Sequence, residues 1–448
     1  MFRVRRFVLT LLPVLFAAAQ DQKFRTDVNQ VLVPVVVTDA KGHRVANLRA
    51  EDFELSEDGV AQKILSFSAG TEPLTAELDA SVAAAGKKSK PKDAAAVSPA
   101  PAASDAPAAR RTYAICVDTL HSGFENFPAV RKALENFFEH EQRSDSEYWL
   151  ISLGKKPEVL QYPTADPKVM LAAIRAKSFL TAIQNSEASA LGTQISALRR
   201  QLDDYCSGRC PCGRSTRPIP MECVGPKQSI IGLVTSSADR TQIFTEFYLK
   251  ELRAVVEDLS HMPGNRTMIL ISDGFNLVPG RELYGVMRAY FPNEDRWQLN
   301  ERDTTPHLEP ILRAAAASNI TFYGLNSSGL GSSGGAGAVF QASSQGTSSR
   351  GAAQTIMPQI NSEASRVTYE NGTTMAALAK ATGGAFIENS NALLSGIQRA
   401  FADTRDYYVL GYVPSNAAMD GSYRTIAVKV SDPKVVVRAK AGYWAAAQ

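Results

Sequence analysis

The sequence lacks a long hydrophobic run and an excess of charge of one sign. No apolar segment reaches the roughly 20 residues that a membrane-spanning helix needs, which argues against a transmembrane segment. The formal net charge of the 448 residues is +3, and loss of the basic start with Arg3, Arg5 and Arg6 would leave no positive excess. A role in nucleic-acid binding is therefore disfavoured, because no net positive field would attract phosphates.

Sequence patterns typical of enzymes are also missing. There is no pair of carboxylates at a fixed helical spacing, no phosphate-binding glycine-rich loop and no Ser/His/Asp set in a fitting frame. Residues 331–335 match G-x-S-x-G, with Ser333 in the position of the nucleophile. The surrounding segment 327–353 is rich in Gly and Ser and does not predict the helix that must follow such a serine. We interpret it as a flexible loop.

The chain opens with the three parts of a secretory signal. Met1–Arg6 is basic, Phe7–Phe16 is a short apolar stretch, and Ala17–Ala19 is a small-residue cleavage site. We therefore predict a signal peptide over residues 1–19 and an exported protein, either periplasmic or secreted. No cysteine follows the cleavage site, which argues against a lipid anchor.

Export decides how the cysteines are interpreted. Cys206, Cys210, Cys212 and Cys223 form a cluster, and Cys116 stands alone in an apolar strand. In an oxidising compartment such a cluster favours two disulfides over a zinc site, whose paired C-x2-C spacing is missing here. The spacing does not give the pairing. We expect Cys116 to be a small buried core residue.

Residues 111–403 are predicted to alternate strands and helices. The expected elements are a strand at 113–117, a helix near 126–140, a hairpin formed by YWLISLG and EVLQYP, a helix at 241–260, strands at 267–272 and 320–325, the helix MAALAKAT ended by Gly383, and the strand GAFIE. This alternation predicts the α/β class, with a doubly wound, mostly parallel sheet covered by helices on both faces.

Two β-rich segments flank this region. Residues 20–70 contain the hairpin signal Asp58-Gly59, and residues 404–448 contain three further strand-like runs. Each segment is too small to be stable alone, so we hypothesise that they pair into one small β-sandwich with the α/β domain inserted between them. Residues 71–110 are dominated by Ala, Pro, Ser and Lys and are predicted to be a disordered linker.

These features together resemble the von Willebrand factor A (vWA) domain. The strand ending on Asp118, the edge hairpin and the segment MILISDGF carry the resemblance. Five blocks in order, among them LAKATGGAFIENSNAL and DYYVLGYVP, are similar to the exported VWFA-related family of Acidobacteria and cover nearly the whole mature chain. The resemblance implies a Rossmann-like sheet with a metal-ion-dependent adhesion site at the carboxyl ends of its strands.

The same resemblance implies a set of oxygen ligands for Mg2+, Mn2+ or Ca2+. Asp118 and Ser122 match two positions of the family motif D-x-S-x-S, and Asp273 matches the aspartate after a central strand. Leu120 stands where the motif has a serine and supplies no oxygen. A water could replace this neutral ligand, because Mg2+ commonly retains several waters.

The family motif also requires a threonine from a separate loop. It is expected at the start of the 241–260 helix, where the spacing does not choose between Thr241 and Thr245. The competing interpretation is that Asp118 and Asp273 bind no ion and only accept backbone N–H groups of the loops at the strand ends. His121 next to Asp118 invites a zinc interpretation, but no second histidine is near, and a solvent-facing loop histidine is the simpler one.

An insertion near residues 180–240 carries the cysteine cluster together with Arg209, Arg214 and Arg217. It either forms a basic rim of the metal-site face that contacts an acidic partner, or it is a disulfide-stabilised surface excursion. The leading functional hypothesis is an exported, non-enzymatic protein-interaction module that binds a partner, for example through a partner's carboxylate. The alternatives are a hydrolase using Ser333 or a metal-bound water, and a purely structural envelope component.

Overall fold

A computed structural model describes residues 30–69, 111–141, 145–184, 187–207, 209–215, 217–294, 297, 302–327, 353–388 and 393–445. The predicted signal peptide at 1–19, the linker at 71–110 and the segment around Ser333 lie outside these residues. No described helix combines the length and the apolar character that a membrane crossing requires.

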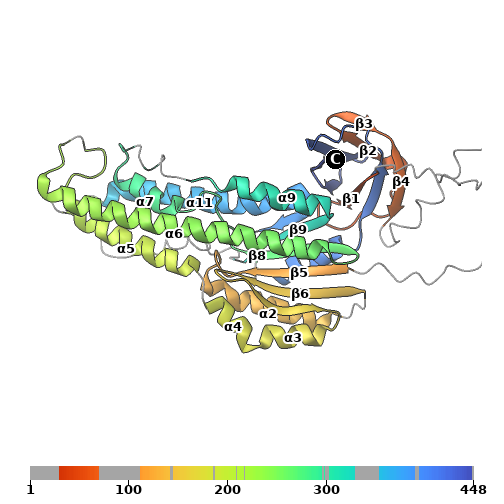
Figure 1. The fold of residues 1–448 in the computed structure, drawn as a ribbon, viewed down its shortest axis with the longest axis horizontal. Coiled ribbons are helices and arrows are strands. Elements are labelled where there is room, and N and C mark those ends of the chain that lie inside the picture. Colours follow the sequence, from red (N-terminus) through yellow and green to blue (C-terminus); the bar gives the residue numbers. More distant parts are fainter. Residues whose placement is uncertain are drawn as a thin grey trace, which may run out of the picture.

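A six-stranded sheet forms the centre of the molecule (Figure 1). Its strands are β5 (Arg111–Asp118), β6 (Ser146–Leu153), β7 (Glu158–Thr164), β8 (Asn265–Ser272), β9 (Ile320–Asn326) and β10 (Ala385–Ile387). They lie in the order β7-β6-β5-β8-β9-β10, and only β7 is antiparallel to its neighbour. In chain order this is 3-2-1-4-5-6, the arrangement of a doubly wound sheet. The predicted α/β class with a mostly parallel sheet is confirmed.

Helices cover both faces of this sheet, because each central strand is apolar on both sides. In β5, Tyr113, Ile115 and Val117 point into one core, whereas Ala114 and Cys116 point into the other. The first face is covered by α2 (Phe127–His140), α3 (Pro167–Arg175), α4 (Lys177–Gln184) and α12 (Leu393–Asp403). The second face is covered by α6 (Met221–Ser260), α9 (Leu308–Ala317) and α11 (Ala353–Thr382).

Helix α6 is twice as long as the sequence predicts. The pattern indicated a helix over 241–260, but the helix begins at Met221 and has 40 residues, about 60 Å of length. Gly225, Pro226 and Gly232 have low helix propensity, so the sequence pattern did not indicate a helix over the first half of α6. Burial of that half in a separate apolar core overrides those local preferences.

This separate core belongs to a helical extension that projects beyond the sheet (Figure 1). It is formed by α5 (Glu187–Ser207), the first half of α6 and α7 (Arg281–Tyr290). Ile230 and Val234 of α6 pack there with Leu198 and Leu202 of α5. The predicted insertion is therefore a packed helical unit, and its last third is part of α6.

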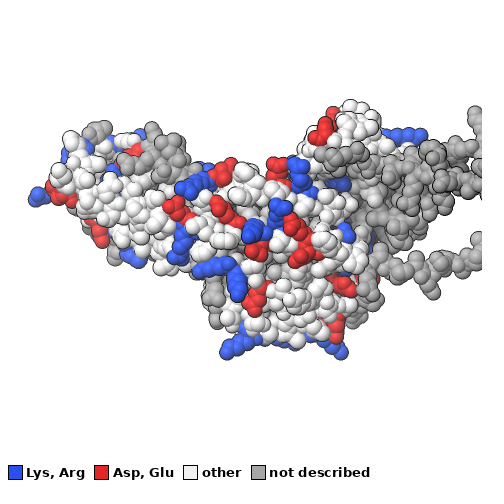
Figure 2. All heavy atoms as spheres, in the orientation of Figure 1, with Lys and Arg blue, Asp and Glu red and all other residues white. Residues whose placement is uncertain are grey.

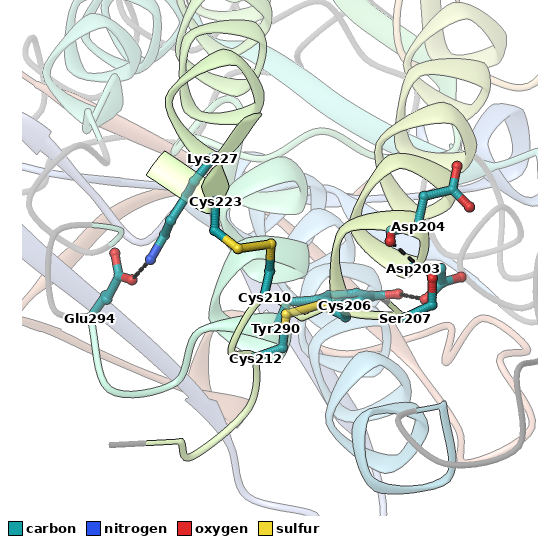
Figure 3. The surroundings of a disulfide bond; sticks show 10 residues. All are labelled: Asp203, Asp204, Cys206, Ser207, Cys210, Cys212, Cys223, Lys227, Tyr290 and Glu294. Carbon is teal, nitrogen blue, oxygen red and sulfur yellow. Dashed lines mark hydrogen bonds and ion pairs between the residues drawn. A yellow bond between two sulfur atoms is a disulfide. The ribbon is translucent and has the colours of Figure 1, made fainter. Parts of the chain in front are cut away.

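Two disulfides close the tip of the extension, as predicted from the cysteine cluster. They join Cys206 to Cys212 and Cys210 to Cys223. The second bond ties the segment after α5 to the first turn of α6 (Figure 3). The free cysteine Cys116 is buried in the sheet, as expected, and burial raises the pKa of its thiol.

The surroundings of these bonds are held by polar contacts between the helices. Lys227 of α6 is buried, pairs with Glu294, and lies 4.3 Å from the ring centroid of Phe291. Tyr290 at the end of α7 donates a hydrogen bond of 2.5 Å to Asp203 of α5. The tip is thus fixed by covalent and ionic links as well as by apolar packing.

Strands from the two ends of the chain form a β-sandwich. They are β1 (Val31–Thr38), β2 (Phe53–Glu57), β3 (Val60–Gln62), β4 (Ile64–Ala69), β11 (Tyr408–Tyr412), β12 (Tyr423–Val430), β13 (Val436–Ala439) and β14 (Gly442–Trp444). The sheets have the orders β13-β1-β11-β4 and β14-β12-β2-β3 and pack around one apolar core. Each sheet therefore contains strands of both terminal segments, in agreement with the pairing hypothesis.

A buried ion pair crosses between these terminal segments. Glu57 at the end of β2 lies 3.3 Å from Arg424 of β12, and the side chains of both residues are 2% exposed. The hydroxyls of Tyr412 and Tyr443 donate to the second carboxylate oxygen of Glu57, at 2.5 and 2.9 Å. Arg424 also donates to the carbonyls of Asn416 and Ala418. The Glu57 carboxylate thus contacts side chains of β11, β12 and β14, and its partner Arg424 also binds the loop before β12.

We expect the variant Arg424→Met to lower the free energy of unfolding by about 3–5 kcal/mol, because Glu57 would remain buried without a counter-charge. Chemical denaturation followed by circular dichroism measures this change. Lys429→Met removes an exposed cation from the same strand and serves as the matched control. Equal stability of the two variants would contradict the assigned role of the pair.

Candidate functional site

The carboxyl ends of β5 and β8 bring three of the predicted site residues together. Asp118 ends β5, Ser122 lies in the loop after it, and Asp273 follows β8. The backbone N–H of Asp273 donates to the hydroxyl of Ser122 at 3.1 Å, and the hydroxyl of Ser272 donates to Asp118 at 2.6 Å. The two loops are therefore linked directly through these side chains.

Asp118 is fully buried and surrounded by donors. Its Oδ1 accepts the backbone N–H groups of Leu120 and His121 at 3.0 and 2.9 Å. Its Oδ2 accepts the Ser272 hydroxyl and lies 3.1 Å from Nδ1 of His121. Although burial raises the pKa of Asp118, the charge of His121 and these hydrogen bonds hold it below its ordinary value. A carboxylate accepts about four hydrogen bonds, so Asp118 is saturated.

Asp273 is also buried but has fewer hydrogen-bond partners than Asp118. Its Oδ2 accepts the backbone N–H of Gly123 and the side-chain amide of Asn126, both at 2.8 Å. Its Oδ1 accepts the hydroxyl of Ser327 at 2.5 Å. Burial raises the pKa of Asp273 to about 6, against the effect of these bonds and with a contribution from the charge of Asp118.

The predicted threonine ligands lie near this edge but not at a helix start. Thr241 and Thr245 are in the middle of α6, and their hydroxyls donate to the carbonyls of Ser237 and Thr241 at 3.0 and 3.1 Å. The expectation that one of them begins a helix is wrong, because α6 continues for 20 residues before Thr241. Leu120 is 3% exposed and packs in the apolar core beneath α6.

These residues do not fit the predicted divalent-ion site. All acceptor positions of Asp118 hold hydrogen bonds, Asp273 has one position left, and Leu120 is a core residue. An ion at Asp118 would have to displace a donor that closes one of the loops. The arrangement agrees with the competing interpretation, in which both aspartates brace the loops at the strand ends. Among the described residues, no group of three or more His, Cys, Asp and Glu side chains gathers as for a metal ion.

Contrary to the expectation from the sequence, His121 does not face solvent. Its imidazole lies between Tyr248 and Phe275, with ring centroids at 4.6 and 5.3 Å, and only 17% of its side chain is exposed. Its Nδ1 faces Asp118, which accepts and therefore fixes the proton on this nitrogen. Its Nε2 is buried and has no hydrogen-bond partner in the described part of the chain.

A cavity of about 60 Å³ lies beside His121, between the sheet edge and the helical extension. Its walls come from the loops after β5 and β8 and from α5, α6, α7 and α11. Glu282, in the first turn of α7, is 5% exposed, and burial raises its pKa. Glu282 and Asn371 line this cavity but belong to no sequence motif, so no sequence signal could have identified them.

The cysteine cluster lies far from this cavity. Leu191 and Gln194 of the insertion do line the cavity, but the disulfide-bonded Cys223 is in the first turn of α6, about 33 Å of helix away from Thr245. Of the two interpretations of the cysteine segment, the structure agrees with the disulfide-stabilised surface excursion and not with the basic rim of the site. On the face drawn in Figure 2, acidic and basic side chains are interspersed and neither sign covers a broad area.

Comparisons with known proteins give no family. No protein-family model and no curated protein matches the chain. Among solved structures, an aerotolerance-related membrane protein from Bacteroides fragilis is 9% identical, with a TM-score of 0.26, and the match covers 65% of this chain and 98% of that one. A manganese-loaded TRAP protein from Plasmodium vivax is 12% identical, with a TM-score of 0.24, and the match covers 74% and 92% of the two chains. These values carry no argument about family or function.

The raised pKa of Asp273 predicts a pH dependence of stability. Because the folded-state pKa is about 6 and the ordinary value is 3.8, the contribution of this group is fully present below 3.8 and is lost as the pH rises through 6. Relative to Asp273→Asn, the wild-type free energy of unfolding should fall by about 3 kcal/mol across this window. Denaturation series from pH 3.5 to 7 on both proteins measure the difference. Asp258→Asn, at an exposed position of α6, is the control, and a pH-independent difference would contradict the prediction.

We also expect calorimetric titration with Mg2+ or Mn2+ to give no saturable heat, because the carboxylates are occupied by protein donors. Asp118→Asn and Asp273→Asn should behave like the wild type in this assay. Saturable heat in the wild type that both variants lose would establish a metal site here and overturn this expectation.

Proposed function

We propose that the chain is an exported, non-enzymatic protein-interaction module with a vWA-type α/β domain, which binds a protein partner at the carboxyl edge of its central sheet. The observation that carries the proposal is the cavity at this edge, next to Asp118, Ser122 and Asp273. Ligands of doubly wound sheets bind at the carboxyl ends of the strands, where the order reverses, and here this point lies between β5 and β8.

Two features support the vWA assignment. The sheet has the order of a doubly wound domain with one antiparallel edge strand, β7. Asp118 and Asp273 follow adjacent central strands, as the first and last motifs of the resemblance require. The proposal departs from the family in one respect, because binding at this face would need no divalent ion.

Two disulfides support export, since such bonds persist mainly in oxidising compartments. They connect a short segment that would be loosely held without them. The proposed partner is therefore another exported or envelope protein.

A hydrolase is the second candidate. It is favoured by the pair of Asp118 and His121, in which a buried carboxylate orients an imidazole. Among the described residues, however, no hydroxyl or thiol is hydrogen-bonded to Nε2 of His121. A nucleophile would have to come from elsewhere, and for this reason we favour the binding function.

Site-specific photo-crosslinking in cells that export the protein tests the proposal. A photoreactive side chain at Phe124, which is 49% exposed in η2 (Phe124–Asn126) beside Gly123 and the carboxyl edge, should give a discrete adduct with one partner. The matched control is Tyr162, an aromatic residue that is 70% exposed on the edge strand β7. Adducts at Tyr162 alone, or none at either position, would contradict binding at this face.

A further inference from the structure

Three of the residues that line the cavity at the carboxyl edge each carry a buried polar atom that has no hydrogen-bond partner among the described residues. These atoms are Nε2 of His121, Oε2 of Glu282 and Oδ1 of Asn371. Leaving such atoms buried and unpaired costs about 1–3 kcal/mol each. Three of them around one cavity indicate a ligand that pairs with them.

Two of these atoms, Oε2 of Glu282 and Oδ1 of Asn371, are hydrogen-bond acceptors, and Nε2 of His121 is an acceptor in the neutral imidazole. A carboxylate oxygen and an amide oxygen accept only, and Nε2 of His121 carries a lone pair when the proton is on Nδ1, facing Asp118. The ligand must therefore supply several donors from one small group. A primary ammonium group has three N–H donors and no acceptor, which matches this set in number and polarity.

The charge of the cavity floor favours the same ligand. Glu282 is nine-tenths buried, and the neighbouring cation Arg281 is paired with Glu370 at 2.8 Å. Arg240, which lines the cavity, is exposed on α6 and lies 5.7 Å from the ring centroid of Phe244. A buried carboxylate is stabilised by an opposite charge, which the ammonium group would provide.

The rest of the cavity suits an alkyl stem. Leu120, Phe244, Phe275 and Pro279 line it beside the polar atoms. Its volume of about 60 Å³ compares with about 10–15 Å³ for one water on a similar measure, so it holds more than a single solvent molecule. An ammonium group on a short unbranched chain combines the polar and the apolar requirement.

We propose that this cavity binds a primary ammonium group on an alkyl stem, supplied by a lysine side chain of a protein partner or by a free alkylamine. The inference deepens the proposed function, because binding of a partner's lysine rests on that function whereas binding of a free alkylamine does not. It reverses the polarity that the sequence suggested, because the edge would receive a cation where a metal site would receive a carboxylate.

Calorimetric titration of the full mature chain with n-butylamine tests the site. Butylamine should bind saturably, whereas n-butanol and butyrate should not, because they lack the ammonium donors. Glu282→Gln keeps the shape of the side chain but removes its charge and should weaken butylamine binding about tenfold or more. Glu309→Gln removes an exposed carboxylate of α9 and should leave binding unchanged.

A lysine derivative blocked at its backbone groups, compared with its Nε-acetylated form, separates the two sources. Binding of the blocked lysine assigns the site to a partner's side chain, and binding of butylamine alone assigns it to free amines. If water alone fills the cavity, no amine binds the wild type, and the proposal falls. Equal binding of butanol, preference for butyrate, or full affinity in Glu282→Gln would also overturn it.

Two further measurements keep the test decisive. If Glu282→Gln does not fold, Asn371→Leu replaces it, and the comparison of the four small ligands on the wild type still decides. Photo-crosslinking at residue 124 is scored independently. A crosslinked partner without amine binding removes this inference only, and amine binding without a crosslinked partner removes the proposed function only.

Discussion

The arrangement of the site depends on one continuous helix that is shared by two hydrophobic cores. The first half of α6 packs in the core of the helical extension, and its second half packs against the central sheet. Because one continuous helix belongs to both cores, it fixes the position of the extension relative to the carboxyl ends of the strands. The cavity lies where this helix passes from one core to the other, and Arg240, Thr241 and Thr245 face it from the middle of α6.

The polar groups at this edge divide into two sets with opposite character. Asp118 and Asp273 are surrounded by donors of their own loops, and they stabilise the junction between β5 and β8. His121, Glu282 and Asn371 instead each keep a buried polar atom that has no hydrogen-bond partner in the described part of the chain. In a low-dielectric interior, hydrogen-bonded polar groups stabilise the structure strongly, whereas polar groups without a partner destabilise it. The first set therefore accounts for the shape of the edge, and the second set is the basis of the proposed binding.

Much of the fold could be predicted because its signals are local. The apolar runs of β5 and β8, the hairpin of β6 and β7, and the turn at Asp58-Gly59 each follow from a few neighbouring residues. The first half of α6 could not, because Gly225 and Pro226 disfavour a helix that is stabilised by tertiary burial and a disulfide. For the site, the positions of Asp118, Ser122 and Asp273 at one sheet edge were expected from the resemblance of their motifs to the vWA domain. Glu282 and Asn371 could not be predicted, because they come from helices distant in sequence and only packing brings them to His121.

The β-sandwich adds a constraint on how the chain reaches this state. Tyr412 bonds to Glu57 across 355 positions of sequence, and β1 pairs with β11 across a similar separation. Closing so long a loop has an entropic cost that opposes these pairings until the ends of the chain are brought together. If the α/β domain folds first, it brings the ends of its first and last elements into proximity and shortens the effective loop. The buried ion pair of Glu57 and Arg424 then forms last, so that completion of the sandwich depends on a correctly folded sheet and, with it, on an intact carboxyl edge.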